Sequence, residues 1–208
     1  PASGQYVAQV VMKSIIQALA KPENAAMVSI FVPGELLTAA GLTPYSVEAL
    51  SCFLAGTKCE QAFLRKTVEE GFPETMCSYH RVSLGAALTG LLPKPKCIVY
   101  TNLACDGNMM TFPYLKQTCD RPSFYIDVPY EKNQDSIHYV ADQLREMKCF
   151  LEDVTGKKIS EEQVEQTISN SRKAATYYQK QLKLRKDHDP VTTMTNELYA
   201  IFMCHLLA

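Results

Sequence analysis

Short apolar runs alternate with amphipathic segments over residues 1–132. The runs are rich in β-branched residues and are bounded by turn residues, which is typical of strands. The amphipathic segments carry their apolar residues at helical spacing. The pattern predicts strands at Met27–Val32, Thr43–Val47, Cys97–Thr101 and Ser123–Val128, and helices at Tyr6–Ala20, Glu35–Ala40, Glu60–Gly71, Ser78–Leu92 and Met110–Thr118. This alternation predicts an α/β fold with a mostly parallel, open, Rossmann-like sheet flanked by helices on both faces.

The last third of the chain has long helical periods and no predicted strand. One helix is predicted over Asn133–Val154, and the next begins after Ser160, because Ser160 and Gln163 have the spacing of a capping box. A final apolar helix is predicted over Val191–Leu207. We therefore expect an α/β domain with an N-terminal helix over residues 1–132, followed by long connector helices over residues 133–208.

The composition is that of an ordinary globular protein, with 208 residues of which 47% are hydrophobic and 21% charged. Lys and Arg total 21 against 22 for Asp and Glu, so the net charge of −1 argues against binding to nucleic acid or to an anionic membrane. No apolar run approaches the roughly 20 residues that cross a bilayer, and the N-terminal residues do not form a secretory signal. We expect a cytoplasmic protein that binds neither nucleic acid nor membrane.

Eight cysteines are many for a protein of a reducing compartment. None of them forms a C-x-x-C pair, which argues against a zinc ribbon or a thioredoxin-like site. The sequence also has no HExxH motif, Ser-His-Asp order or Walker loop, and its four histidines suggest no role. Cysteines beyond the needs of packing indicate metal binding, redox chemistry or nucleophilic catalysis.

Two cysteines lie where a parallel sheet usually binds its ligands. Cys105 comes shortly after the Cys97–Thr101 strand, and Cys77 directly precedes the Ser78–Leu92 helix. In an open α/β sheet, ligands bind outside the carboxyl ends of the strands, close to helix N-termini. The helix dipole favours a thiolate there, and a thiolate can coordinate metal.

The residues after Cys105 also suit a ligand site. Gly107 allows the backbone to turn tightly and to approach a bulky group, and Asp106 or Asn108 can hydrogen-bond a ligand. Spacing alone leaves open whether Cys77 and Cys105 are ligands or packing residues, because free cysteine is among the most buried residue types. The other six are expected to be structural, four from their apolar or helical contexts and two in spite of nearby loops: Cys52, Cys97, Cys149 and Cys204, then Cys59 and Cys119.

Five segments occur in the order that one protein family shows: FVPGELLTAAGLTPYS (Phe31–Ser46), ETMCSYHRVSLGAAL (Glu74–Leu88), CIVYTNLACDGNMMTFPYLKQ (Cys97–Gln117), FYIDVPY (Phe124–Tyr130) and LEDVTGKKISEEQVEQTI (Leu151–Ile168). On these segments the chain resembles the 2-hydroxyglutaryl-CoA dehydratase D-component family, which includes subunits of 2-hydroxyacyl-CoA dehydratases and benzoyl-CoA reductases. The likeness extends over nearly the whole chain, from about Met27 onward.

The resemblance implies a 4Fe–4S cluster held by three cysteines, with one iron open to substrate. Two positions match here, Cys77 within ETMCSYHR and Cys105 within NLACDGN. In the family the third cysteine belongs to a second α/β domain that follows the helical connector, so the third ligand is expected beyond Ala208. The fragment alone is then expected to lack both the cluster and activity. Ser29 is the nearest match to a serine that lies near the open iron.

The function implied by the resemblance is that of an iron–sulfur subunit, or of an N-terminal fragment of one, in a 2-hydroxyacyl-CoA dehydratase. Such a hydro-lyase eliminates water from an (R)-2-hydroxyacyl-CoA through a ketyl radical, after ATP-driven one-electron activation. The implied partners are a paralogous dehydratase subunit and a separate ATP-dependent activator. Two alternatives stay open: a subunit of a related ATP-dependent reductase of the benzoyl-CoA type, and a non-catalytic subunit that only holds a cluster.

Overall fold

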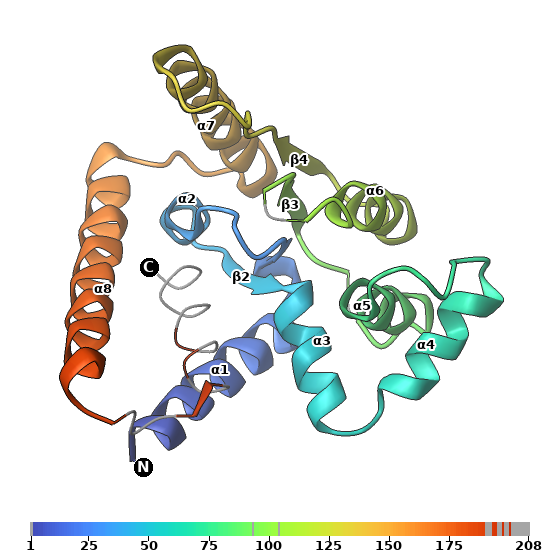
Figure 1. Ribbon diagram of the computed structural model, residues 1–208. Coiled ribbons are helices and arrows are strands. Elements are labelled where there is room, and N and C mark those ends of the chain that lie inside the picture. Colours follow the sequence, from blue (N-terminus) through green and yellow to red (C-terminus); the bar gives the residue numbers. More distant parts are fainter. Residues whose placement is uncertain are drawn as a thin grey trace.

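The computed structural model describes residues 2–92, 94–103, 105–189, 193, 194, 197 and 200. Four strands form its sheet: β1 (Ala25–Val28), β2 (Thr43–Ser46), β3 (Cys97–Thr101) and β4 (Ser123–Ile126). Helices precede, connect and follow them (Figure 1): α1 (Ala2–Ala20), the short 3₁₀ helix η1 (Pro22–Asn24), α2 (Gly34–Ala39), α3 (Val47–Gly56), α4 (Glu60–Glu69), α5 (Ser78–Leu88), α6 (Asn108–Cys119), α7 (Gln134–Thr155) and α8 (Glu161–Asp187).

The sheet is parallel throughout, with the strand order β2-β1-β3-β4. Every residue of the central strands β1 and β3 is buried, as expected where helices cover both faces. The predicted α/β fold with a parallel sheet is therefore confirmed. The chain leaves β1 for β2 on one side and returns to β3 on the other, so the strand order reverses between β1 and β3. In such sheets this switch point is where ligands bind.

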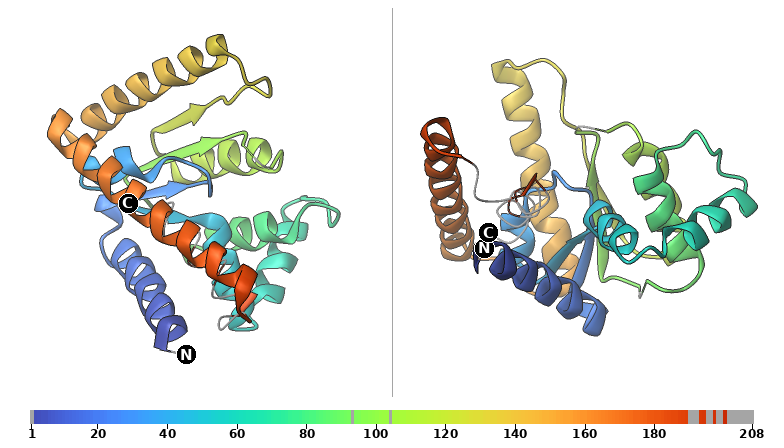
Figure 2. Two further views of the ribbon diagram at one scale, coloured as in Figure 1. Left: turned by 60° about the vertical axis from the view of Figure 1, so that its left-hand side comes forward. Right: turned by 60° about the horizontal axis from the view of Figure 1, so that its bottom comes forward.

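Helices cover the two faces of the sheet as separate layers. Met27 and Ile98 contribute to one core together with residues of α3, α4, α5 and α6. The neighbouring residues Val28 and Val99 contribute to a second core together with α2 and α7. Successive side chains of a strand point to opposite faces, which explains this division. The right view of Figure 2 shows α2 and α7 on one side of the strands and α4 to α6 on the other.

The first strand differs from its prediction at both ends. β1 spans Ala25–Val28, whereas the apolar pattern predicted Met27–Val32. The chain turns at Ser29, where the Val32 N–H donates to the Ser29 carbonyl (3.2 Å). Val32 is fully buried although it lies in a loop. The apolar residues after Val28 therefore reflect the burial of this loop, and the prediction of strand there is wrong.

The sequence prediction omitted helix α3 altogether. Its signals are nevertheless present: the Ser46 hydroxyl caps the helix by accepting the Ala49 N–H (3.3 Å), and Val47, Leu50 and Leu54 are buried at helical spacing. The run of small and apolar residues in VEALSCFLAG hid this periodicity.

The other predicted elements occur within a few residues of their expected bounds. Gly41 follows α2 in the left-handed region (φ 75°), the conformation in which glycine commonly ends a helix. The helix predicted over Val191–Leu207 falls almost entirely outside the described residues. In the described part of the chain, no helix combines the length and the apolar character needed to span a membrane.

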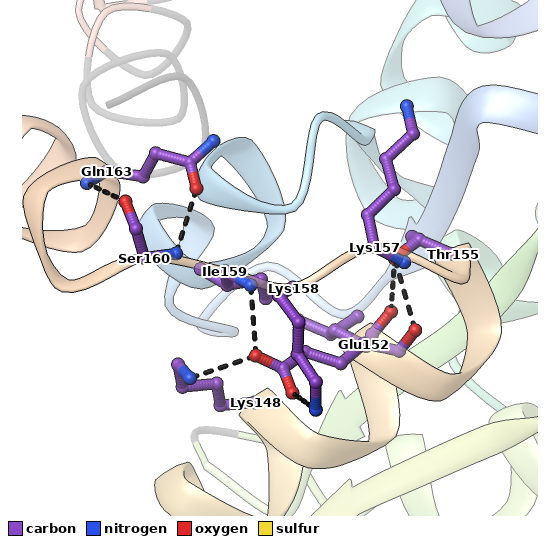
Figure 3. Close-up of polar contacts among 9 residues, drawn as sticks. Lys148, Glu152, Thr155, Lys157, Lys158, Ile159, Ser160 and Gln163 are labelled. Carbon is purple, nitrogen blue, oxygen red and sulfur yellow. Dashed lines mark hydrogen bonds and ion pairs between the residues drawn. The ribbon is translucent and has the colours of Figure 1, made fainter.

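Glu152 holds the turn between α7 and α8 (Figure 3). Its largely buried carboxylate accepts hydrogen bonds from Lys158 Nζ (2.6 Å), the Ile159 N–H (2.9 Å) and Lys148 Nζ (3.0 Å). These donors, Lys158 first, lower the pKa of Glu152 to about 2. The carboxylate therefore fixes the point at which the chain leaves α7 and enters α8.

The start of α8 and its contact with α2 are also fixed by side chains. Ser160 and Gln163 form the predicted capping box, which is confirmed (Figure 3). Further along α8, the Ser171 hydroxyl donates to Glu35 Oε1 on α2 (2.6 Å). The helix is thus anchored at its beginning and again at its contact with α2.

Removing the charge of Glu152 is expected to destabilise this junction. Glu152→Gln leaves two lysines without their carboxylate, so we expect a lower Tm at pH 7 in thermal unfolding followed by circular dichroism. The exposed Glu165 of α8 offers a control, because Glu165→Gln changes the same group at the surface. An unchanged Tm for Glu152→Gln would contradict a role for this carboxylate in the junction.

The same carboxylate predicts a dependence of stability on pH. The folded pKa of Glu152 is lower than the value of about 4.3 expected in the unfolded chain, so its contribution is complete above that value. The contribution is lost as the pH falls toward the folded pKa of about 2. The difference in Tm between wild type and Glu152→Gln should therefore be largest near pH 7 and shrink below pH 4. A difference that does not change with pH would contradict this assignment.

Candidate functional site

The carboxyl ends of β1 and β3 are joined directly at the switch point. The fully buried Ser29 follows β1, and its hydroxyl accepts the N–H of Thr101 at the end of β3 (3.1 Å). The Ser29 N–H donates to the Val99 carbonyl (3.3 Å). Ser29 therefore lies at the predicted edge of the sheet. Its side chain ties the two loops of this edge together, and its proximity to a cluster stays a prediction.

Cys105 lies in the loop between β3 and α6, on the same edge of the sheet. Its side chain is half-buried. The buried Asn108 anchors this loop, because its Nδ2 donates to the Thr101 carbonyl (2.9 Å) and its backbone N–H donates to the Cys105 carbonyl (3.1 Å). The Oδ1 atom of Asn108 is buried and has no hydrogen-bond partner among the described residues. Asn108 thus positions the cysteine and leaves one acceptor unused.

The loop after β3 is also fixed to the end of β4. Asn102 Nδ2 donates to the Val128 carbonyl (3.0 Å) and to Asp127 Oδ1 (3.0 Å), and the Val128 N–H donates to Asn102 Oδ1 (2.8 Å). Asn102 therefore acts like a further residue of the strand ladder. It limits the freedom of the segment that leads to Cys105.

Cys77 occupies the N-cap position of α5. Its side chain is exposed and makes no capping hydrogen bond, whereas its carbonyl accepts the N–H of Arg81. Arg81 is itself buried and donates to the carbonyls of Glu74 (3.0 Å) and Leu64 (3.1 Å). The guanidinium thereby holds the loop before Cys77 against α4. The thiol is left accessible at the positive end of the α5 dipole.

His80 connects α5 to the Cys105 loop. Its Nε2 lies 3.3 Å from Cys105 Sγ, and its Nδ1 lies 2.9 Å from the Thr111 hydroxyl of α6. The ring is 2% exposed, and this burial lowers its pKa, which favours the neutral imidazole. His80 is one turn along α5 from Cys77, so the two residues lie on the same side of the helix. The first turn of α5 and the Cys105 loop therefore meet at one place.

Gly107 leaves the space that the imidazole occupies. A Cβ atom at this position would lie 2.7 Å from His80 Cδ2 and Nε2, and 3.3 Å from Cys105 Sγ. The backbone of Gly107 is right-handed (φ −56°), so the tight turn expected from the sequence does not explain this glycine. Glycine is instead required here by the close approach of His80. The bulky group that the backbone of Gly107 approaches is therefore a side chain of the protein itself.

His80 and Glu48 are site residues that the sequence prediction missed. A Cys-x-x-His spacing at a helix start, which places both side chains on one face, was the available signal for His80. Glu48 lies in the first turn of α3, and its Oε1 accepts the N–H of Ile30, next to Ser29 (3.4 Å). Burial raises the pKa of Glu48, so this carboxyl holds a proton more readily than an exposed one.

The remaining cysteines differ in their surroundings. Cys97 and Cys119 are buried, and burial raises the pKa of both thiols, that of Cys97 to about 12. The expected structural role is therefore confirmed for these two. Cys149 lies in a helix, α7, but its side chain is exposed, so the expectation that it has a structural role in packing is wrong. Cys52 is half-buried, Cys59 is exposed, and Cys204 lies outside the described residues.

Two thiols at one edge suit part of an iron–sulfur ligand set, since thiolates are the usual ligands of such clusters. The unused acceptor of Asn108 and the accessible thiol of Cys77 fit a group bound between the two loops. Within the described ranges, no three side chains of His, Cys, Asp or Glu gather closely enough to hold a metal ion. The described residues therefore do not by themselves gather a complete set of metal ligands.

Comparison with known proteins identifies the family to which this chain is similar. The chain is 27% identical over 152 residues to the (R)-phenyllactyl-CoA dehydratase alpha subunit of Clostridium sporogenes, a match that covers 69% of this chain and 37% of that protein. The chain thus spans little more than a third of the length of this curated relative. Residues 29–207 match the family described as 2-hydroxyglutaryl-CoA dehydratase, D-component. Because this match covers most of the sequence, the chain belongs to the 2-hydroxyglutaryl-CoA dehydratase D-component family.

Proposed function

We propose that this chain is the N-terminal part of an iron–sulfur subunit of a 2-hydroxyacyl-CoA dehydratase, and that Cys77 and Cys105 are two of its cluster ligands. The observation that carries the proposal is the contact between His80 and Cys105, which brings the start of α5 to the loop after β3. This junction lies at the switch point of the parallel sheet, where α/β proteins bind ligands.

The residues of this chain hold and shape the site. Cys77 offers an accessible thiol at a helix N-terminus, and Cys105 offers a second thiol from a loop that Asn108 anchors. A 4Fe–4S cluster held by three thiolates supplies one-electron chemistry and an open iron position. We propose that the third thiolate comes from outside the described residues, because no third ligand side chain gathers at the site within them.

Exposed apolar side chains occur on the segments that follow β1 and β3, where the proposed site lies. Leu103 follows β3, Met109 and Met110 lie in the first turn of α6, and Phe31 follows β1. Their exposed fractions lie between 39% and 51%. A charged acyl group placed against such side chains would lose its hydration without compensation. We therefore propose that the substrate is a 2-hydroxyacyl-CoA whose acyl group is apolar.

The proposal includes two partners. The relative from Clostridium sporogenes is named as an alpha subunit, which supports assembly with a second dehydratase subunit. We propose in addition a separate ATP-dependent activator that supplies one electron, so that the substrate loses its hydroxyl group as a ketyl radical. Assembly of the site between subunits would keep water away from the radical.

The test uses the full-length protein, purified without oxygen together with its partner subunit and an activator. We expect bound iron and sulfide, visible absorption of an iron–sulfur cluster, and ATP-dependent conversion of (R)-phenyllactyl-CoA to the unsaturated acyl-CoA. (R)-2-hydroxyglutaryl-CoA, whose acyl group carries a free carboxylate, should react more slowly. Iron-free protein after reconstitution would overturn the cluster assignment. A cluster-loaded complex that dehydrates neither substrate would overturn the proposed activity.

A further inference from the structure

We propose that His80 is a positioning residue that donates a hydrogen bond from Nε2 to the sulfur of Cys105, and that Thr111 fixes the required tautomer. The inference rests on the proposed function, because it assigns His80 a role toward a cluster-binding thiolate. It concerns a residue that lies beside the ligand without being one.

The geometry limits how protons can be arranged along this chain of contacts. His80 Nε2 lies 3.3 Å from Cys105 Sγ, and Nδ1 lies 2.9 Å from Thr111 Oγ1. A thiolate bound to iron has no proton to donate, so the proton of this contact must be on Nε2. Nδ1 of the neutral ring then accepts the hydroxyl proton of Thr111. Both nitrogens are thereby satisfied in a ring that is 2% exposed.

The surroundings hold the ring in this position. Thr111 is fully buried on α6, His80 lies on α5, and Cys105 lies between β3 and α6, so three segments meet at the imidazole. Gly107 lies under the ring, and a Cβ atom there would come within 2.7 Å of Nε2. These contacts fix the position of the ring, and in this position Nε2 lies within hydrogen-bond distance of the Cys105 sulfur.

A hydrogen bond to a cluster thiolate changes how easily the cluster is reduced. An N–H donor withdraws electron density from sulfur and stabilises the more negative, reduced state. His80 would therefore raise the reduction potential of the cluster and make one-electron transfer from the activator easier. A side chain that hydrogen-bonds a cluster ligand in this way also fixes the orientation of that ligand.

The test compares reduction potentials in the full-length, cluster-loaded protein. His80→Phe keeps the ring and removes the donor, so we expect near-normal iron content and a potential shifted to more negative values. A tenfold change in the one-electron equilibrium corresponds to about 59 mV, which a titration followed by electron paramagnetic resonance resolves. His80→Gln places an amide N–H near the position of Nε2 and should restore part of the shift.

Variants of the neighbouring residues keep the inference testable if His80→Phe folds poorly. Thr111→Val removes the hydroxyl at similar volume and should move the potential in the same direction, whereas Thr111→Ser should not. Gly107→Ala should displace the ring and act like His80→Phe. Equal potentials in all cluster-loaded variants would overturn the inference and leave the proposed function intact. An iron-free wild type would instead overturn the proposed function.

Discussion

Replacing Cys77 or Cys105 with alanine is expected to remove most of the iron from the full-length protein and to abolish dehydration. Each substitution deletes one of few thiolates, and a cluster held by fewer ligands dissociates more readily. The loss of activity should exceed the roughly 10–100-fold that the loss of an outer-shell contact costs. Iron and sulfide analysis, the visible spectrum and the dehydration rate with (R)-phenyllactyl-CoA measure the effect.

The chain offers a matched control for each of these cysteines. Cys59 is exposed at the N-cap position of α4, as Cys77 is at that of α5, and Cys52 is half-buried, as Cys105 is. Cys59→Ala and Cys52→Ala should keep the iron content and the activity, with only a small loss of packing for Cys52. Equal iron content in all four variants would refute the assignment of Cys77 and Cys105 as ligands.

Gly85→Ala is expected to have the largest effect on stability. Gly85 lies where α5 crosses α4, and an added Cβ atom would come within 2.2 Å of the Phe63 carbonyl oxygen. The clash involves backbone atoms, which cannot turn away as a flexible side chain can, so α4 and α5 must separate. We expect a loss of roughly 3 kcal/mol in the free energy of unfolding, at the upper end of typical overpacking costs. Chemical denaturation followed by circular dichroism measures this loss.

The control for this substitution is Gly56→Ala at the end of α3. Apart from the adjoining residues and backbone of its own helix, no described atom lies within 4 Å of a Cβ placed at Gly56, and the residue is exposed. Alanine should there be neutral or stabilising by up to about 1 kcal/mol, because it restricts the unfolded chain. A similar free energy of unfolding for both variants would show that α4 and α5 tolerate the extra methyl group. The displacement in Gly85→Ala should also disturb the start of α5, which carries Cys77.

The sheet could be predicted from the sequence because its central strands are short, apolar and bounded by turns. β3 has the predicted bounds, Cys97–Thr101, since both of its faces are covered and nearly every residue must be apolar. The same rule misplaced β1, because Val32 is buried in a loop and an apolar run does not distinguish a strand from a buried turn. Helix α7 could be predicted because its apolar residues recur at helical spacing over 22 residues, a length at which this spacing is unambiguous.

The candidate site could be predicted only in part. Cys77 and Cys105 stood out because each adjoins the end of a regular element, and topology brings such ends to one edge of a parallel sheet. His80 did not stand out, since its role depends on the contact of α5 with α6, which no local pattern encodes. The sequence indicated Gly107 as a residue of a tight turn. Its actual role is to leave space for the His80 ring of α5, and residues next to Gly107 in the sequence carry no signal of that ring.

The anchoring of α8 has a mechanical consequence. This helix is about 40 Å long at 1.5 Å per residue, and it is clamped at its first turn by the Glu152 junction and near its middle by the bond from Ser171 to Glu35. Glu35 belongs to α2, which begins directly after the loop that Ser29 opens. A displacement of the far end of α8 would therefore be transmitted through the contact between Ser171 and Glu35 to α2 and to the loop that precedes it.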